Sequence, residues 1–485
     1  MKSEPNRQVR AIGSISCQSR RLVGVIAAAV LTACGGSDKD ADGPPTQQEV
    51  VVTGCNGTVT YVEAEGAFAN GSPWSMRRPT GWNGLLINDL DYVPAKDGAR
   101  SCYWLQRGYA LSGTGRNPQR NFNYDPDREQ QELISVIDMF NARYGKPTKV
   151  IQYGHSGGGF VALNFAERYP EKVDGVVVGC AHEPVPLMNM MLDGWFVLKT
   201  LIASELQVVG FSDLASVADQ SAKWRVALTL AQQSQEGRAR IALAAAVGQW
   251  PVWSNATRAQ PDPFDLGALQ SAVFDTVLLN AAQPGGQSRF MFEHAGTSPA
   301  VRQLSWNAGI DYSQLLARAE PAVGRLVLSL YSTNGLNLQA DLATLRDATR
   351  VQVEPAASEF WNGPGRTVHG TPKVPSLRMH TTGDNVVPPN IIDSYVQKMQ
   401  ANGGDIGLYR TTIVDRAGHC TFEPSESAAA IETVLTRINT GVWPDVSPAG
   451  MNARAKALLP ASVPAFVPYE PVRANRPQNN PSGGL

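Results

Sequence analysis

A serine set among glycines is the feature of this 485-residue chain most suited to chemistry. Residues 149–153 (KVIQY) form a short run rich in strand-forming residues, followed by GHSGGG at 154–159 and a helix-like segment at 160–168. A strand, a tight turn through G-x-S-x-G and a helix make a nucleophile elbow, which lifts the serine hydroxyl above the edge of a sheet. The glycines neither match a P-loop nor a dinucleotide fingerprint, so a phosphate cradle is excluded. The pattern predicts Ser156 as a nucleophile.

A nucleophilic serine needs a histidine base and an acid that orients it, in the chain order serine, acid, histidine. Among the six histidines, His419 follows a strand-like run at 408–414 and a glycine-containing loop, which is where the base is expected. Asp384 directly follows the strand-like run 376–382 and is the predicted acid. Asp393 and Asp415 compete with it, but the first is expected on the next helix and the second is expected to cap the loop before His419.

Composition excludes several classes of protein. The chain has 42 Lys and Arg against 43 Asp and Glu, so its formal net charge is −1 and it lacks the basic excess of a nucleic-acid binder. Hydrophobic residues make up 43% of the chain, which is ample for a sizeable core. No repeat of 20–50 residues is visible, which argues against solenoids and propellers.

Three segments, in this order, resemble the α/β-hydrolase superfamily: VIQYGHSGGG, LRMHTTGDNVVPP and VDRAGHC. The resemblance covers roughly 51–185 and 372–445. It implies an α/β fold with a mostly parallel, eight-stranded sheet flanked by helices. It also implies a catalytic triad of Ser156, Asp384 and His419, which needs no metal and no organic cofactor.

The oxyanion hole departs from the superfamily pattern. Gly157, next to the nucleophile, is the expected first backbone donor. The segment 82–92 takes the place of the strand that normally ends in His-Gly, yet here it ends in Leu90-Asp91-Tyr92. A backbone N–H needs no particular side chain, so the second donor is left open, with Tyr92 as the candidate. An inward-pointing Asp91 carboxylate would oppose an oxyanion.

The six cysteines indicate an oxidising compartment. Cys17 lies in the predicted leader and Cys34 at its end, which leaves four thiols for two disulfides in three possible pairings. Their spacing does not suit a zinc site. Tannases and feruloyl esterases share a His-Cys pair like His419-Cys420, but they place its partner cysteine beside the nucleophilic serine, where this chain has His155. We therefore expect Cys420 to bond to Cys180 at the end of the adjacent strand, and Cys55 to Cys102.

The first residues predict where in the cell the protein is targeted. Arginines precede the apolar run 22–33, which is too short to span a bilayer and reads as the core of a signal peptide covering 1–33. The sequence Leu31-Thr32-Ala33-Cys34 resembles the bacterial lipobox, which implies cleavage before Cys34, diacylation of its sulfur and membrane attachment in the cell envelope, at the outer membrane. The small, polar residues at 34–50 are expected to form a flexible tether.

An insertion at 186–371 is expected to form a large, mainly helical cap, and 446–485 a Pro-rich tail. Six of the ten tryptophans fall within the cap. They are expected mainly to build its own core, and alternatively to line an apolar cleft. The predicted pocket residues are His155, Met188 and Trp195, with Arg116 or Asn117 near the mouth of the cleft.

These observations favour a secreted, lipid-anchored serine hydrolase that cleaves a carboxylic ester of a small molecule or polymer through an acyl-enzyme. A peptidase or amidase with the same triad is the first alternative. A non-catalytic binding module on a hydrolase scaffold is the second, because the Leu90-Asp91 segment is unusual.

Overall fold

The computed structural model describes residues 50–281, 286–296 and 302–472. The predicted leader, Cys34 and nearly all of the predicted tether lie outside these residues, as does 473–485. Within the described residues, no helix is both long and apolar enough to cross a membrane.

One mixed sheet forms the centre of the catalytic core. Its strands lie in the order β1-β2-β3-β5-β4-β6-β7-β8-β9-β10. Their bounds are β1 Val50–Gly54, β2 Val59–Ala67, β3 Pro73–Pro79, β4 Leu85–Asp89, β5 Ala110–Thr114, β6 Lys149–His155, β7 Gly175–Gly179, β8 Ser376–Gly383, β9 Tyr409–Ala417 and β10 Phe466–Val467. The pairings from β5 through β9 are parallel. The mostly parallel α/β sheet expected from the sequence is confirmed.

The sheet has ten strands where eight were expected. The additional strands are the short β1 and β10, which pair antiparallel at the two edges. Central strands such as β7 (GVVVG) are buried along their whole length. Their apolar runs follow from helices covering both faces of a parallel sheet.

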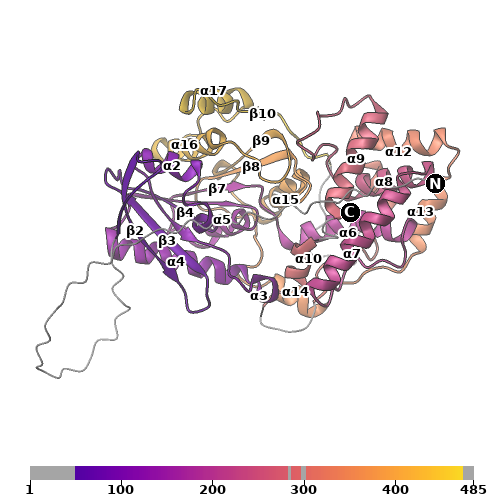
Figure 1. The fold of residues 1–485 in the computed structure, drawn as a ribbon, viewed down its shortest axis with the longest axis horizontal. Helices are drawn as coiled ribbons and strands as arrows, with labels where there is room; N and C mark the ends of the chain where they lie inside the picture. Colours follow the sequence, from indigo (N-terminus) through magenta and orange to yellow (C-terminus); the bar gives the residue numbers. More distant parts are fainter. Residues whose placement is uncertain (1–49, 282–285, 297–301, 473–485) are drawn as a thin grey trace, which may run out of the picture. The chain divides into compact units, whose positions relative to one another are not determined.

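Helices of the core pack on the two faces of the sheet (Figure 1). Apolar residues of α4 and α5 form a cluster on one face, and those of α2, α16 and α17 a cluster on the other. The bounds of these helices are α1 Tyr92–Ala95, α2 Ala99–Gln106, α3 Arg120–Asn123, α4 Pro126–Tyr144, α5 Gly157–Arg168, η1 Pro389–Ile391, α15 Ile392–Asn402, η2 Ile406–Leu408, α16 Pro424–Thr440 and α17 Pro448–Leu458.

The insertion between β7 and β8 is helical, as expected, and Figure 1 shows its helices grouped together, apart from those that cover the sheet. They are α6 Pro184–Leu201, α7 Leu214–Ala231, α8 Gln235–Gly248, α9 Leu266–Ala281, α10 Gly286–Glu293, α11 Tyr312–Ala317, α12 Pro321–Thr333, α13 Leu338–Asp347 and α14 Pro355–Trp361. Helix α6 is buried nearly all round. A helix that is apolar on every side forms the centre of a helical layer.

Tryptophans build the core of this cap. Five of the six cap tryptophans are at most 2% exposed, and Trp195 packs edge-on against Trp224 with ring centroids 5.1 Å apart. Met188 is 1% exposed and belongs to the same cluster. The structure therefore corrects the prediction that Met188 and Trp195 line the substrate pocket, because both side chains are enclosed by other cap residues.

The tail is more ordered than its prolines indicated. Helix α17 packs on α16 through the buried Met451 and Ala455, and β10 extends the sheet next to β9. The Asn452 side chain bonds to both backbone groups of Phe466 and joins the two elements. Residues 448–467 therefore belong to the catalytic core and are not an irregular surface tail.

Candidate active site

The backbone at Ser156 has the strained shape of a nucleophile elbow. Ser156 lies between β6 and α5 with φ 55° and ψ −118°, a conformation that residues with a side chain rarely adopt. Its N–H donates to the carbonyl of Gly179 at the end of β7, 2.9 Å away. The turn thus places the Ser156 side chain at the carboxyl edge of the sheet and at the N-terminus of α5.

Two of the glycines around Ser156 are required by close backbone contacts. A Cβ on Gly154 would lie 2.3 Å from the carbonyl oxygen of Gly158, and one on Gly159 would lie 2.7 Å from that of Gly179. Real Cβ atoms do not approach a carbonyl so closely. The glycine-rich sequence therefore allows α5 to begin directly against the ends of β6 and β7.

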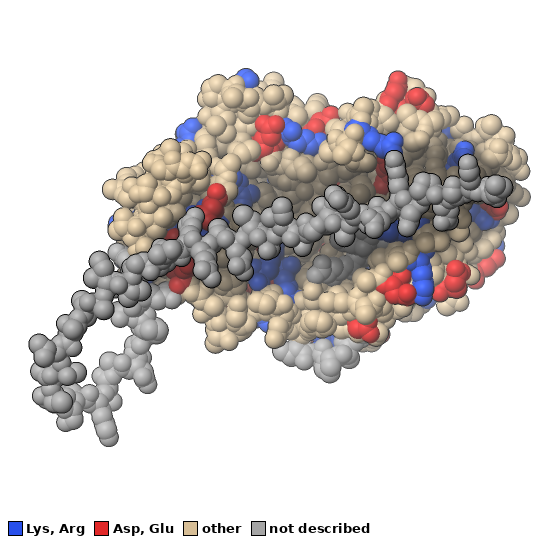
Figure 2. Space-filling view, viewed as in Figure 1, with Lys and Arg blue, Asp and Glu red and all other residues tan. Residues whose placement is uncertain are grey.

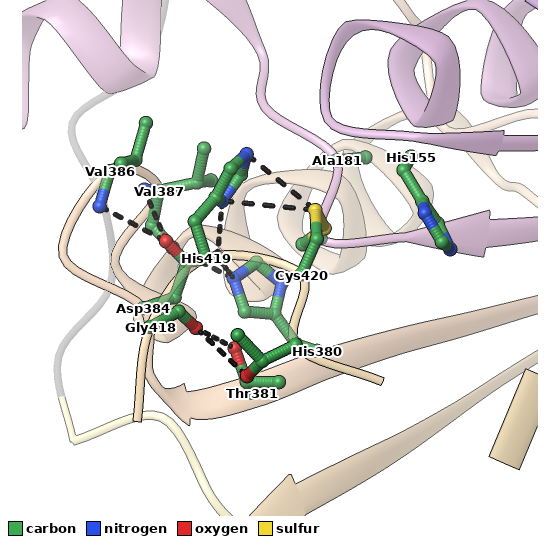
Figure 3. The surroundings of a disulfide bond; sticks show 12 residues. His155, Ala181, His380, Thr381, Asp384, Val386, Val387, Gly418, His419 and Cys420 are labelled. Carbon is green, nitrogen blue, oxygen red and sulfur yellow. Dashed lines mark hydrogen bonds and ion pairs between the residues drawn. A yellow bond between two sulfur atoms is a disulfide. The ribbon is translucent and has the colours of Figure 1, made fainter. Parts of the chain in front are cut away.

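Asp384 and His419 meet beside this turn. Asp384 follows β8 and is fully buried, and its Oδ2 lies 2.7 Å from His419 Nδ1. The backbone N–H groups of Val386 and Val387 donate to its other oxygen, at 3.0 and 2.8 Å. A carboxylate only accepts hydrogen bonds, so Nδ1 carries the hydrogen and Nε2 is left for proton transfer. Figure 3 shows these groups around the His419 ring.

Burial and pairing set the charges of the acid and the base. Burial would raise the pKa of Asp384, but His419 and His380 outweigh it and lower that pKa to about 2. Burial would lower the pKa of His419, but the charge of Asp384 and its hydrogen bond outweigh burial and raise it above its usual value. Asp384 is therefore ionised at neutral pH, and His419 is a stronger base than a free imidazole.

The competing aspartates have other partners. Asp415 accepts a hydrogen bond of 2.7 Å from the Thr382 hydroxyl, and Asp393 lies in the first turn of α15. The placement of Asp393 on the helix agrees with the sequence, whereas Asp415 lies within β9 and bonds across to β8 and does not cap the loop before His419.

His380 is a neighbour of the acid that the sequence did not single out. Its ring is fully buried, with Nε2 2.8 Å from the carbonyl of Val387 and 3.5 Å from Asp384 Oδ2. Burial lowers its pKa, so the ring is neutral and holds the acid loop without adding a charge. The sequence could have indicated His380 by its position in a strand four residues before Asp384. Its contact with Val387 could not be predicted, because it exists only where the loop after Asp384 folds back toward the His380 ring.

The predicted disulfides Cys55–Cys102 and Cys180–Cys420 are both present. The second joins the end of β7 to the residue after His419, and Cys420 Sγ lies 3.5 Å from His419 Nε2. Cys180 and Cys420 both have positive φ. Cys180, His419 and Cys420 lie close enough to share a metal ion, but the disulfide removes both thiolate ligands.

A chain of short contacts connects nucleophile and base. Ser156 bonds to Gly179, the next residue is Cys180, and the disulfide leads to Cys420 beside His419. Among the described residues no hydrogen bond joins the Ser156 hydroxyl to His419. Hydrogen bonds between a nucleophile and its base often reach their short length only in the reacting complex.

The first turn of α5 has the segment after β4 as its neighbour. A Cβ on Gly158 would lie 3.4 Å from Leu90 Cβ and 3.6 Å from Asp91 Oδ2. The Leu90-Asp91 segment therefore lies where the second oxyanion donor is expected. The Tyr92 side chain is buried in the apolar cluster with α2 and α16, so Tyr92 could contribute only its backbone. The oxyanion roles of Gly157 and Tyr92 stay predictions.

Asp91 does not stand free beside the oxyanion site. Both of its oxygens accept hydrogen bonds from Arg116, one of them at 2.7 Å from Nη2. Because Arg116 neutralises the Asp91 carboxylate, this carboxylate does not oppose an oxyanion at this position. Arg116 lies near the start of α5, whereas Asn117 is turned away and bonds to Asn70 and Ser72. Their expected place near the mouth of the cleft stays a prediction.

His155 does not line a pocket as predicted. Its Nε2 lies 2.5 Å from the Tyr153 hydroxyl and its Nδ1 lies 3.2 Å from Arg100 Nη1. Burial, together with the charge of Arg100, holds its pKa well below the usual value. Figure 3 shows its side chain directed away from His419. Because successive strand residues point to opposite faces, the ring packs beneath the sheet edge while the next residue projects above it.

The triad geometry predicts a pH dependence. Since His419 must be neutral to accept a proton, kcat/KM should fall as the pH drops below its raised pKa, with an inflection above 6.5.

Asp384→Asn should lower kcat by about 10⁴-fold by losing the orienting carboxylate. The matched variant Asp415→Asn should retain most activity. Near-full activity in Asp384→Asn, measured by ester hydrolysis across pH 5–9, would show that another acid is used.

The two disulfides provide a matched pair of variants. Removing Cys180–Cys420 by alanine substitutions should lower kcat by about 10- to 100-fold, because displacing a catalytic group by about 1 Å costs about that much. Removing Cys55–Cys102 in the same way should lower the thermal midpoint and leave kcat much closer to the native value. Equal losses of kcat in the two double variants, at a temperature where both are folded, would contradict this assignment.

A known protein matches this chain over most of its length, and others match parts of it. The o-phthalyl amidase of Xanthobacter agilis is 40% identical over 421 residues, which is 82% of this chain and 92% of that protein. A (lyso)-N-acylphosphatidylethanolamine lipase of Mus musculus is 30% identical over 95 residues, 20% of this chain and 25% of that protein. The family model of serine aminopeptidase S33 matches residues 94–259.

Among solved structures, feruloyl esterase B from Aspergillus oryzae matches with 14% identity, 80% of this chain and 82% of that chain covered, and a TM-score of 0.37. The family is shown by the long match to the amidase, which extends through both core and cap. The chain belongs to the α/β-hydrolase superfamily of serine hydrolases, in the same family as the o-phthalyl amidase of Xanthobacter agilis.

Proposed function

We propose that this protein hydrolyses the amide bond of a small aromatic acyl amide, with the o-phthalyl group as the leading candidate for the acyl part. The observation that carries the proposal is the 40% identity to an o-phthalyl amidase over 82% of the chain. A match of this length includes the cap, and substrate choice depends on the residues around the site, not on the fold alone. The sequence favoured an ester substrate and gave an amide as the first alternative. The match to the amidase now favours the amide.

Acylation uses the three predicted residues in turn. His419 Nε2 takes the hydroxyl proton of Ser156 as Oγ attacks the carbonyl carbon, and the Gly157 N–H stabilises the oxyanion. The carbon–nitrogen bond then breaks while His419 returns the proton to the leaving amine. The products of this half-reaction are an ester on Ser156 and a free amine.

Deacylation repeats the cycle with water. His419 removes a proton from the water that attacks the acyl carbon, and the Ser156 oxygen leaves with that proton. Asp384, whose pKa is about 2, stays ionised throughout and steadies the imidazolium. The carboxylic acid departs and the free enzyme is restored.

Esters of the same acyl group form a second candidate substrate class. They pass through the same acyl-enzyme, and an alcohol leaves more readily than an amine, so a site that cleaves the amide is competent to cleave the ester. The intact Ser156, Asp384 and His419 disfavour a purely binding role.

Labelling with a fluorophosphonate tests the reaction. Ser156→Ala should abolish labelling and hydrolysis, whereas Ser332→Ala, an exposed serine on α12, should change neither. The native protein should release 4-nitroaniline from the phthalyl 4-nitroanilide and 4-nitrophenol from the corresponding 4-nitrophenyl ester. Cleavage of the ester alone would make the protein an esterase, and an absence of Ser156-dependent labelling would reject the hydrolase role.

We also propose that the enzyme is exported and held at the outer membrane by lipid on Cys34. The apolar run before Cys34 and the lipobox-like residues support this, and each buried lipid methylene contributes about 0.8 kcal/mol to anchoring. Figure 2 shows acidic and basic side chains interspersed on the face in view. The disulfides agree with an oxidising compartment.

Two cysteine variants test this anchor. Cys34→Ser should move the protein from the membrane fraction to the soluble fraction and abolish incorporation of an alkyne-labelled fatty acid. Cys17→Ser, inside the predicted leader, should leave both unchanged. Membrane retention and labelling of Cys34→Ser would contradict the anchor.

A further inference from the structure

Two guanidinium groups stand beside the first residue of α5. A Cβ built on Gly157 would lie 2.9 Å from Arg120 Nη2 and 3.1 Å from Arg116 Nη1. Both arginines come from the segment between β5 and α4, and Gly157 is the expected first oxyanion donor. Two guanidinium N–H donors therefore lie next to the place where the scissile carbonyl oxygen is expected.

Each of the two guanidinium groups is hydrogen-bonded to a carboxylate. Asp91 binds Arg116 through two oxygens, and Glu129 accepts a hydrogen bond of 2.7 Å from Arg120 Nε. The Arg120 guanidinium also lies 4.4 Å over the ring of Tyr124. Paired and stacked arginines lose little further entropy on binding an anion, so these groups are preorganised.

Each arginine keeps one buried nitrogen without a hydrogen-bond partner among the described residues, Nη1 in Arg116 and Nη2 in Arg120. These are the same two atoms that approach Gly157. Arg116 Nη1 has only the more distant Glu129 Oε2, 3.6 Å away. A buried charged donor left unmatched costs more than it would in water. The arrangement is therefore incomplete without an acceptor on the Gly157 side.

The remaining neighbour, His182, adds no charge to this group of side chains. His182 Nε2 would lie 3.4 Å from a Cβ on Gly157, and burial and the two arginines hold its pKa well below the usual value. His182 is therefore neutral at physiological pH. Its ring is wedged between Phe160 and Phe292, with centroids 5.7 and 5.1 Å away, and forms an apolar wall beside the guanidiniums.

We propose that Arg116 and Arg120 form a subsite for a carboxylate carried by the acyl group, on the atom next to the one bearing the scissile carbonyl. This proposal rests on the proposed hydrolase function and specifies its substrate class. An ortho carboxylate on a ring lies directly beside the scissile carbonyl, so its cationic partner must adjoin the oxyanion donor. A para carboxylate points away from Gly157 and gains no contact with either guanidinium.

The other use of this pair would be to help stabilise the oxyanion itself. That role and the carboxylate subsite differ in one measurable respect. Oxyanion stabilisation serves every substrate equally, because all of them develop the same charge on the carbonyl oxygen. A carboxylate subsite serves only substrates that carry the additional anion, so the ratio of two substrates separates the roles.

The kinetic test compares 4-nitroanilides of phthalic, terephthalic and benzoic acids, with the matching esters as a second series. The native enzyme should prefer the ortho acid, and Arg120→Gln or Arg116→Gln should lower the phthalyl-to-benzoyl ratio of kcat/KM by about 10- to 100-fold, the range for a hydrogen bond to a charged group. Arg120→Lys should restore part of it. Arg128→Gln, a partly exposed arginine on α4 that bonds to Asn123, should keep the native ratio. An unchanged ratio in both glutamine variants would overturn the proposal.

A binding measurement separates this proposal from the reaction itself. Calorimetry with Ser156→Ala should show phthalate binding more tightly than benzoate, and adding Arg120→Gln should remove the difference while the thermal midpoint confirms a folded protein. Equal binding of phthalate and benzoate would overturn the subsite even if hydrolysis is found. Arg120-dependent phthalate binding without Ser156-dependent labelling would instead reject the hydrolase role and keep the subsite.

Discussion

The parallel register of four strands is the constraint on which the site depends. His155 pairs with Gly179, and Gly179 with Met379, so β6, β7 and β8 end at the same edge of the sheet. Strand β9 joins them after a register shift near Gly383. Because the carboxyl ends of parallel strands lie together, residues distant in the chain become neighbours there. Ser156, Asp384 and His419 each follow one of these strand ends.

This edge is held by interactions that local sequence could not supply. Ser156, Cys180 and Cys420 all have positive φ, each in a conformation that costs about 1–3 kcal/mol. A disulfide, the buried carboxylate of Asp384 and close backbone packing offset that cost. The cap adds to this support, because Val387 of the acid loop belongs to the same apolar cluster as the cap helices. Core and cap are thus coupled at the acid.

Patterns of local origin were predicted well. The elbow, the acid and the histidine loop could be recognised because each follows a strand and carries residue types that a tight turn or a proton transfer requires. The superfamily resemblance then supplied their order and the choice of Cys180 as the partner of Cys420. The added edge strands escaped notice because a two-residue strand such as Phe466–Val467 has no periodicity and exists only by pairing with β9.

The sequence by itself determined which residues could react, since a nucleophile, a base and an acid are recognisable from residue type, turn chemistry and position after a strand. Tertiary structure alone decided how the side chains are directed. His155 and Trp195 were suited to a pocket by type, but the facing of a strand residue turned His155 toward Tyr153 and Arg100, and the packing of a helix buried Trp195. The sequence likewise determines that Arg116 and Arg120 are charged. Their place beside Gly157 follows from the close approach of the segment after β5 to the start of α5.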